Sequence, residues 1–301
     1  LGFFARRLGL AATYYSRATS DLIRPVSISR ATGYTSRIVN AGTTQNKGVE
    51  LLVHAVPVQT EDFRWRTSFS FSKNDNEVVE LAEGLNGIQL GGEWYGPSWA
   101  RKGEPFGQIV GYTYVRDSQG RIVVGSNGIP LLGPQDVVGN YNPDWLGGWN
   151  NELSYKNFDM SFLLDIRQGG NIYSVTHMFG MYAGVLEETV AGRCLLAGQA
   201  GGNLPDCVEE DGTINGIVFD GVKVTEDGDT VPNDIVTSAQ ALYGGTGYYA
   251  TTEAHTFDAS YVKLRQVSLT YDLPQAWANR LSLSGLQLGL IGRNLGMWGV
   301  D

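Results

Sequence analysis

Charged residues are scarce in this chain of 301 residues. They make up 18% of the sequence, against about 25% in an ordinary soluble domain, and the formal net charge is −9. The longest basic runs are the pairs Arg6-Arg7 and Arg101-Lys102. Because phosphate binding needs clustered lysine and arginine, we expect no nucleic-acid partner.

Long apolar runs and a leader sequence are also missing. No window of about 18 apolar residues occurs, which excludes a transmembrane helix. The chain begins Leu-Gly-Phe-Phe-Ala-Arg-Arg, without a methionine or a signal-peptide cleavage site, and it ends soon after a strand-like run. We expect both ends to be cuts within a longer protein.

Residue types that carry catalysis or bind metals are few and scattered. The three histidines, His54, His177 and His255, show no spacing that indicates a Ser-His-Asp or Cys-His arrangement. Acidic residues gather between Asp206 and Asp234, and clustered carboxylates can hold Ca²⁺. Since the run 226–229 lacks the final glutamate of an EF-hand loop, a solvated loop is the favoured interpretation. We expect no enzyme activity, no cofactor and no metal.

The two cysteines, Cys194 and Cys207, lie in one polar, glycine-rich segment. They are close enough in sequence to close a small loop, and a disulfide is favoured if this segment faces an oxidising space. Two unpaired thiols are the alternative, because a disulfide requires a specific geometry.

Period-two alternation is the clearest pattern in the sequence. Across 63–71 the odd positions are aromatic or threonine, and the even positions are arginine or serine. The same alternation runs through 158–167, where Leu163 is an exception, and through 149–155, where Asn151 interrupts it. A β-sandwich with one solvated face and a membrane barrel with a polar lumen both produce this pattern.

The lengths of the strands and connections favour the barrel. Strands near ten residues match a tilted transmembrane strand, and seven strands are predicted near residues 4–17, 48–57, 62–73, 148–156, 158–168, 259–272 and 283–295. The connections 58–61, 156–157 and 274–281 are short, the last with helical character. The others are long, as expected of extracellular loops, and cover roughly 18–47, 74–147 and 169–258. Residues 181–193 are a candidate helix within the last loop.

Aromatic residues lie near several strand ends, where membrane barrels carry aromatic girdles. In the loop 74–147, Trp94, Tyr95 and Trp99 lie within six residues of each other. Flat apolar rings suit sugar rings and peptide side chains, so these three are the candidate substrate-binding residues. Packing within the loop is the alternative interpretation.

Six segments resemble, in the same order, segments of the SusC/RagA family of TonB-linked outer-membrane transporters. The first contains an Asn-Lys-Gly-Val-Glu strand start, and the six cover residues 40–50, 74–81, 139–145, 155–161, 165–174 and 258–274. The run Arg293-Asn-Leu295 fits the following strand. The loop 175–257 does not share the resemblance.

The resemblance is to the C-terminal part of the family's barrel. It implies an all-β, antiparallel transmembrane β-barrel segment over residues 1–301, with long extracellular loops and with the plug and final strands outside the chain. It further implies active import of a bulky nutrient, a glycan or a peptide, across the Gram-negative outer membrane. TonB and a SusD-like surface lipoprotein would be the partners, and lipid would surround the barrel.

Two other functions remain as alternatives. A passive porin-type barrel would lack a plug before Leu1. A secreted β-sandwich binding module would be soluble without detergent.

Overall fold

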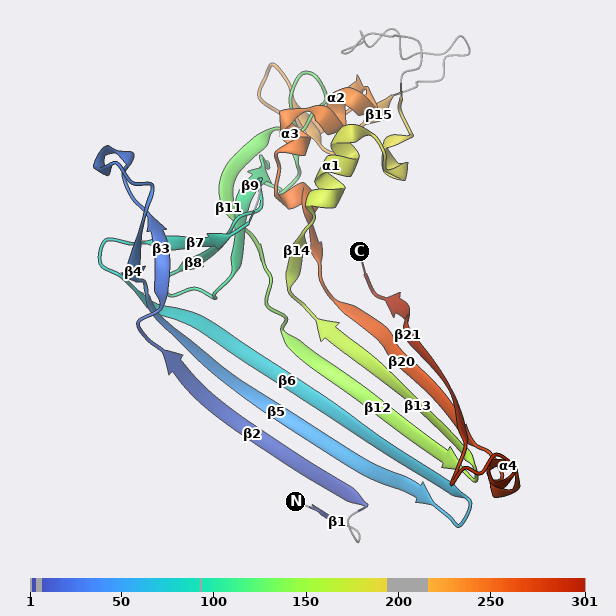
Figure 1. Cartoon of the computed structure of the whole chain (residues 1–301). Coiled ribbons are helices and arrows are strands. Elements are labelled where there is room, and N and C mark those ends of the chain that lie inside the picture. Colours follow the sequence, from blue (N-terminus) through green and yellow to red (C-terminus); the bar gives the residue numbers. More distant parts are fainter. Residues whose placement is uncertain (1, 4–6, 93, 194–215, 301) are drawn as a thin grey trace, which may run out of the picture.

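Eight strands form one antiparallel sheet that runs from one end of the chain to the other (Figure 1). The computed structural model describes residues 2–3, 7–92, 94–193 and 216–300. The seven predicted strands correspond to the last seven strands of this sheet. In sheet order the bounds are β1 Gly2–Phe3, β2 Leu8–Thr19, β5 Gly42–Gln59, β6 Phe63–Leu81, β12 Trp145–Tyr155, β13 Phe158–Gln168, β20 Tyr261–Asp272 and β21 Gln287–Trp298.

The register of the strands collects the alternating apolar residues on one face of the sheet. Direct partners in neighbouring strands make one apolar row, which contains Leu10, Val53, Phe69 and Trp149. Phe69 and Trp149 are still 37% and 39% exposed. The apolar face is therefore open to its surroundings, as the lipid-facing side of a membrane barrel is.

The opposite face, which we call the polar face, carries hydrophilic partners at the intervening positions. Thr13 of β2 lies opposite Glu50 of β5, and Glu50 lies opposite Ser72 of β6. Two ion pairs cross between strands on this face, Arg66 with Glu152 at 2.8 Å and Asp165 with Arg265 at 2.7 Å. A barrel closed with this face inward would have a polar lumen.

The connections lie as the alternation of short and long segments predicts. The short ones, 60–62, 156–157 and the segment with helix α4 (Gln275–Arg280), lie at one end of the sheet (Figure 1). In the two-residue turn 156–157, Lys156 has a φ of 52°, which a tight hairpin requires. The long connections all lie at the other end.

The long connections are folded rather than irregular. A hairpin of β3 (Ile23–Ser27) and β4 (Ser36–Asn40), with η1 (Arg30–Thr32) at its tip, lies above β2. The second connection forms a four-stranded sheet of β7 (Gly87–Gly91), β8 (Ser98–Arg101), β9 (Gln108–Tyr114) and β11 (Leu132–Asn140). A three-stranded sheet contains β10 (Val123–Val124), β16 (Val222–Val224) and β17 (Thr230–Pro232). Two further pairs are β14 (Asn171–Tyr173) with β19 (Thr256–Asp258), and β15 (Ile217–Val218) with β18 (Val236–Thr237).

Short helices in the third connection form a compact unit that we call the helical cap. Its members are α1 (Val175–Ala183), η2 (Glu187–Thr189), α2 (Ala239–Gly244), α3 (Thr246–Tyr249) and η4 (Glu253–His255). The predicted helix 181–193 was wrong in its bounds. The helix starts earlier because the Ser174 hydroxyl caps the amide of His177, and it ends at Gly184, which has a φ of 69°.

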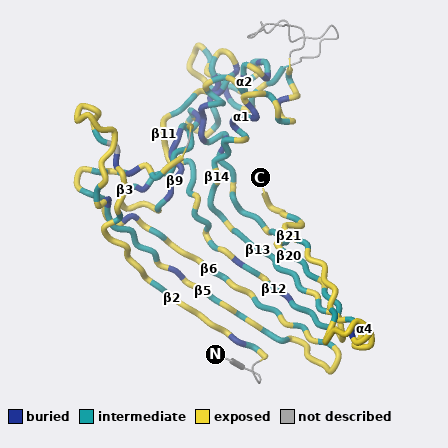
Figure 2. Tube along the Cα trace, viewed as in Figure 1, coloured by how far each residue is buried: buried dark blue, intermediate teal, exposed yellow. Residues whose placement is uncertain are grey.

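Most of the buried side chains belong to the loop structures and not to the sheet (Figure 2). Met178, Leu242 and His255 of the helical cap have almost no exposed surface. The loop structures therefore have hydrophobic cores of their own. Within the described residues, no helix has both the length and the apolar character needed to cross a membrane.

Candidate binding surface on the polar face

The polar face has a hollow at its loop end, which we call the mouth hollow. Its larger part has a volume of about 570 Å³ and its smaller part about 260 Å³, and both parts are lined by Asn46 and Asn74. The larger part is also lined by Thr13, Tyr15, Arg17, Thr19 and Glu50. The smaller part is also lined by Leu22, Arg24, Thr44, Asn76, Phe106 and Asn142.

A glycine allows the first hydrogen-bond network of this hollow to form. Tyr15 of β2 lies opposite Gly48 of β5, and a Cβ atom at Gly48 would be only 2.3 Å from the ring of Tyr15. The ring therefore crosses β5, and its hydroxyl donates to Asn74 Oδ1 of β6 at 2.9 Å. Asn74 Nδ2 in turn donates to Asn46 Oδ1 at 3.0 Å. Three strands are linked by side chains at this point.

A second network fixes Phe106 at the upper edge of the hollow. The Phe106 amide donates to Asn76 Oδ1 at 2.7 Å, and the Phe106 carbonyl accepts from the side chains of Asn140 and Asn142. Asn140 also holds the amide of Asn142 at 2.7 Å. Because these contacts join β6 to the middle and to the C-terminal end of the second long connection, the asparagines hold the loop sheet over the polar face.

Three of the segments that carry the family resemblance, 40–50, 74–81 and 139–145, thus converge on one surface. The sequence analysis did not identify their asparagines as site residues. The spacing in the sequence could have identified them. Asn46 lies an even number of positions from Glu50, and Asn74 lies an even number of positions from Ser72. In a strand, such residues share a face.

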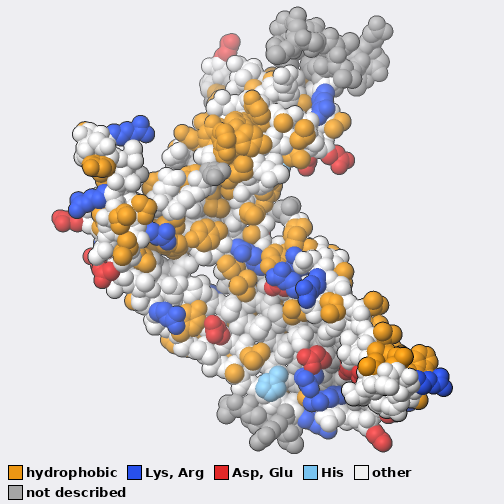
Figure 3. Space-filling view, viewed as in Figure 1, with side chains coloured by type: hydrophobic (Ala, Val, Ile, Leu, Met, Phe, Trp, Pro, Cys, Tyr) orange, Lys and Arg blue, Asp and Glu red, His pale blue; other side chains and the backbone are white. Residues whose placement is uncertain are grey.

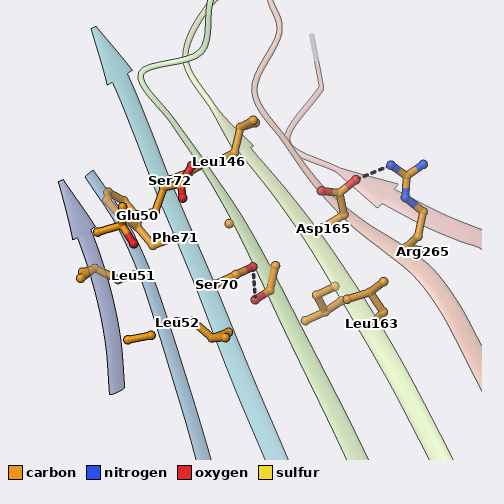
Figure 4. A pocket seen from close by; sticks show the side chains of 15 residues that line it. Glu50, Leu51, Leu52, Ser70, Phe71, Ser72, Leu146, Leu163, Asp165 and Arg265 are labelled. Carbon is orange, nitrogen blue, oxygen red and sulfur yellow. Dashed lines mark hydrogen bonds and ion pairs between the residues drawn. The ribbon is translucent and has the colours of Figure 1, made fainter. Parts of the chain in front are cut away.

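A second hollow of about 680 Å³ lies further from the loops (Figure 4). Small residues, among them Ser70 and Gly148, form part of its lining, and leucines flank them. The Asp165–Arg265 ion pair lies at one edge (Figure 4). Its leucines make this hollow less hydrophilic than the mouth hollow, so it is a weaker candidate for a polar ligand.

The three predicted substrate-binding aromatics do not line the mouth hollow. Trp94 is 61% exposed, and its ring contacts Phe179 of α1 edge-on at 4.8 Å. Tyr95 contacts Tyr249 of α3 edge-on at 5.7 Å, while Trp99 is half-buried in β8. Packing within the loops accounts for these positions without a ligand. Substrate binding by the three residues stays a prediction. Cys194 and Cys207 lie outside the described residues.

The fold brings two of the scattered histidines together. His177 Nδ1 and His255 Nδ1 are 3.0 Å apart in the helical cap. Burial first, and the neighbouring His177 second, lower the pKa of His255 to about 4. Within the described residues, neither ring is hydrogen-bonded to a carboxylate or a serine hydroxyl, so the pair is not the base of a catalytic triad. It is a structural element of the cap.

We expect Gly48→Val to destabilise the folded protein by about 2 to 3 kcal/mol, as overpacking does. The new side chain would displace the ring of Tyr15, and its Cβ atom would also lie 2.7 Å from the carbonyl oxygen of Lys73. Tyr15→Phe removes one exposed hydrogen bond and should cost about 1 kcal/mol or less. Urea unfolding of the complete protein measures both effects.

Gly91→Val is the matched control for this prediction. Gly91 also lies in a strand, but nothing is within 4 Å of the position that a Cβ atom would take there. Equal losses of stability for Gly48→Val and Gly91→Val would show that the contact with Tyr15 is not the reason that position 48 requires glycine.

The sequence is similar over nearly its whole length to known TonB-dependent receptors. It is 27% identical to TonB-dependent receptor P3 of Formosa agariphila, and the match covers 98% of this chain and 28% of the relative. It is 28% identical to TonB-dependent receptor SusC of Bacteroides thetaiotaomicron, over 57% of this chain and 19% of that receptor. The chain therefore spans less than a third of the length of these relatives. No protein-family model matches it.

The fold is similar to solved outer-membrane transporter structures. The RagAB peptide importer in its closed-closed state superposes with a TM-score of 0.67 at 19% sequence identity, covering 99% of this chain and 30% of that chain. The open-open state of the same importer gives a TM-score of 0.65 at 20% identity, with the same coverage. The relatives are receptors and transporters, not enzymes.

Proposed function

We propose that this chain is a barrel portion of a SusC/RagA-type TonB-dependent receptor and forms part of the wall of an active nutrient importer. Its similarity to TonB-dependent receptors and to the RagAB importer supports this. It is an outer-membrane β-barrel segment of a Gram-negative cell. The cargo is a bulky nutrient, a glycan or a peptide. The plug and the final strands of the barrel are supplied by parts of the receptor outside residues 1–301.

The observation that carries this proposal is the two-faced sheet with all its long loops at one end. Its apolar face carries Phe69 and Trp149 exposed, while its polar face carries ion pairs and the mouth hollow. A β-sandwich would bury such an apolar face beneath a second sheet. A large barrel instead presents this face to lipid and the polar face to the lumen.

A SusD-like surface lipoprotein is proposed as the partner at the loop end. Hydrophobic side chains gather over the region of the helical cap (Figure 3). Tyr182, Val185 and Val190 are 55%, 75% and 61% exposed there. Exposed apolar residues in a cluster are typical of a surface that another protein covers. TonB is proposed to act through the receptor's N-terminal part.

The expected result for import is a loss of uptake when either the receptor or TonB is removed. Cells are supplied with a tryptic digest of casein or with a mixture of starch oligosaccharides, and depletion of each component is followed by mass spectrometry. Deletion of the receptor should abolish depletion of its cargo. Deletion of TonB should do the same, because the plug then blocks the lumen.

Two outcomes separate this proposal from its alternatives. Uptake that needs the receptor but persists without TonB would indicate a passive porin. Release of the complete protein from membranes without detergent would indicate a soluble binding module. Purification of the receptor in detergent should also recover a lipidated surface protein, and a receptor that is always recovered alone would contradict the proposed partner.

A further inference from the structure

We propose that the mouth hollow binds a carboxylate group of the imported molecule, through Arg17 and Arg24. This inference rests on the proposed import function and adds the charge class of the cargo. The cargo would carry carboxylates at intervals along its length, whether it is an acidic peptide or an acidic oligosaccharide.

The first observation is a row of side chains that crosses three strands. Arg17 of β2 lies directly opposite Asn46 of β5, and Asn46 lies directly opposite Asn76 of β6. Neighbouring strands are about 4.8 Å apart, so a guanidinium group and two amides follow one another across the polar face. Arg24 of β3 adds a second guanidinium group, on the lining of the smaller part of the hollow.

The second observation is that the side-chain oxygens of these asparagines already accept hydrogen bonds, whereas their side-chain N–H groups are available to a ligand. Asn46 Oδ1 accepts from Asn74, and Asn76 Oδ1 accepts from the amide of Phe106. Within the described residues, the Nδ2 groups of Asn46 and Asn76 have no hydrogen-bond partner. A ligand in the hollow would therefore meet N–H groups, and an anion is the partner that accepts from all of them.

The third observation is that both arginines lack a carboxylate partner in the described part of the chain. Arg66, Arg116, Arg121 and Arg265 form ion pairs there, and Arg17 and Arg24 are among the arginines that do not. The chain has 31 acidic residues and 22 lysines and arginines, so carboxylates are not in short supply. Glu50 lines the larger part of the hollow and Glu80 lines a neighbouring cavity with Arg24, but neither pairs with these arginines.

The chemistry of the row fits a carboxylate. A guanidinium group offers a planar fork of donors that matches the two oxygens of a carboxylate, and charge-assisted hydrogen bonds of this kind are about twice as strong as neutral ones. Inside a barrel, the protein walls exclude part of the water and concentrate the field of the arginines. An acidic cargo would therefore be drawn to the mouth hollow and held there.

The test measures the affinity of the purified complete receptor for two matched pairs of ligands. One pair is a glutamate pentamer and a glutamine pentamer, and the other is an oligogalacturonate and its methyl ester. We expect the receptor to bind the acidic member of one pair at least about 10-fold more tightly, equivalent to about 1.4 kcal/mol. The pair that shows the preference identifies the source of the carboxylate.

The double variant Arg17→Ala/Arg24→Ala should lose this preference and keep its affinity for the neutral member. Arg37→Ala is the control, because Arg37 lies on β4 and does not line the hollow. A wild-type receptor with no preference in either pair would overturn the inference, as would a preference that survives in the double variant. If the carboxylate preference is absent but TonB-dependent uptake of neutral cargo is still observed, the import function stands and only the carboxylate inference fails. The failure of the inference can therefore be distinguished from the failure of the proposed function.

Discussion

Replacing Asn151 with aspartate is expected to destabilise the barrel by about 3 to 4 kcal/mol. Asn151 lies on the apolar face but is only 1% exposed, and its Oδ1 accepts from Trp65 Nε1 at 3.1 Å. Its Nδ2 has no partner in the described residues. A carboxylate at this position must either remain charged in an apolar surrounding or take up a proton, which at pH 7 costs an aspartate about 4 kcal/mol.

The neighbouring residue provides the control for this substitution. Asn150 lies on the polar face, and its side chain donates to Glu152 at 3.2 Å. Asn150→Asp introduces the same group on the polar face, where it loses this hydrogen bond and faces the carboxylate of Glu152, so it should cost about 1 to 2 kcal/mol, still less than Asn151→Asp. Urea unfolding of the complete receptor in lipid vesicles, followed by tryptophan fluorescence, compares the two variants. Equal unfolding midpoints would contradict the assignment of the two faces.

Asn151→Leu refines the prediction. It removes the unpartnered amide nitrogen, but it also leaves the indole N–H of Trp65 without its acceptor. These two effects have opposite signs and are each on the order of 1 to 2 kcal/mol, so the net change should be small. Asn151, which interrupts the alternation, is therefore a single polar residue within the apolar face, and it does not alter the register of β12.

The sequence pattern was sufficient for the parts of the fold where each face has a uniform environment. Across 63–71 of β6 and through β13 the two faces meet different surroundings, and the alternation, which is interrupted at Leu163, locates the start of β6 and both bounds of β13. β6 continues to Leu81, eight residues beyond its predicted end at residue 73. β5 begins at Gly42 rather than near residue 48, because its first residues include Thr43, Thr44 and Gln45. Polar residues on both faces show no alternation, and pairing with β6 and β2 makes them a strand.

A misleading pattern explains the late start of β21. Residues 281–286 read Leu-Ser-Leu-Ser-Gly-Leu, which alternates as a strand does. The amide of Leu283 instead donates to the carbonyl of Ala278 at 3.0 Å and completes the end of helix α4. Local helix-terminal hydrogen bonds override the alternation here, so the strand begins at Gln287 instead of residue 283.

The candidate site was only partly accessible from the sequence, for two reasons. The strand residues of the mouth hollow can be placed on the polar face from their spacing in the sequence. The contacts of Phe106, however, depend on how a long loop folds back. Helix α1 contains Val, Thr, His, Phe and Tyr, which are weak helix formers, so tertiary packing stabilises it. The histidine pair joins residues 78 positions apart through the pairing of β14 with β19. No spacing in the sequence reveals such a contact.

The helical cap is expected to loosen when the pH falls from 7.5 to 5. In the closed cap the pKa of His255 is about 4, against an ordinary value of 6.5, because the ring is buried and faces His177. The opened cap therefore binds more protons between these two values, and the closed state is fully stable only above about pH 6.5. At pH 5 the loss is about 2 kcal/mol, or roughly 30-fold in the equilibrium between closed and open caps.

His177 should add to this effect, since burial lowers its pKa as well, although Glu188 opposes the shift. Hydrogen exchange of α1 and η4 in the complete receptor, corrected for the intrinsic pH dependence of exchange, measures the opening. His255→Phe keeps an aromatic ring in the pocket, and protection in this variant should depend much less on pH. His54→Gln is the control, because His54 lies in β5, far from the cap. Corrected protection that is equal at pH 7.5 and pH 5 in the unmodified receptor would show that the buried pair does not control how the cap closes.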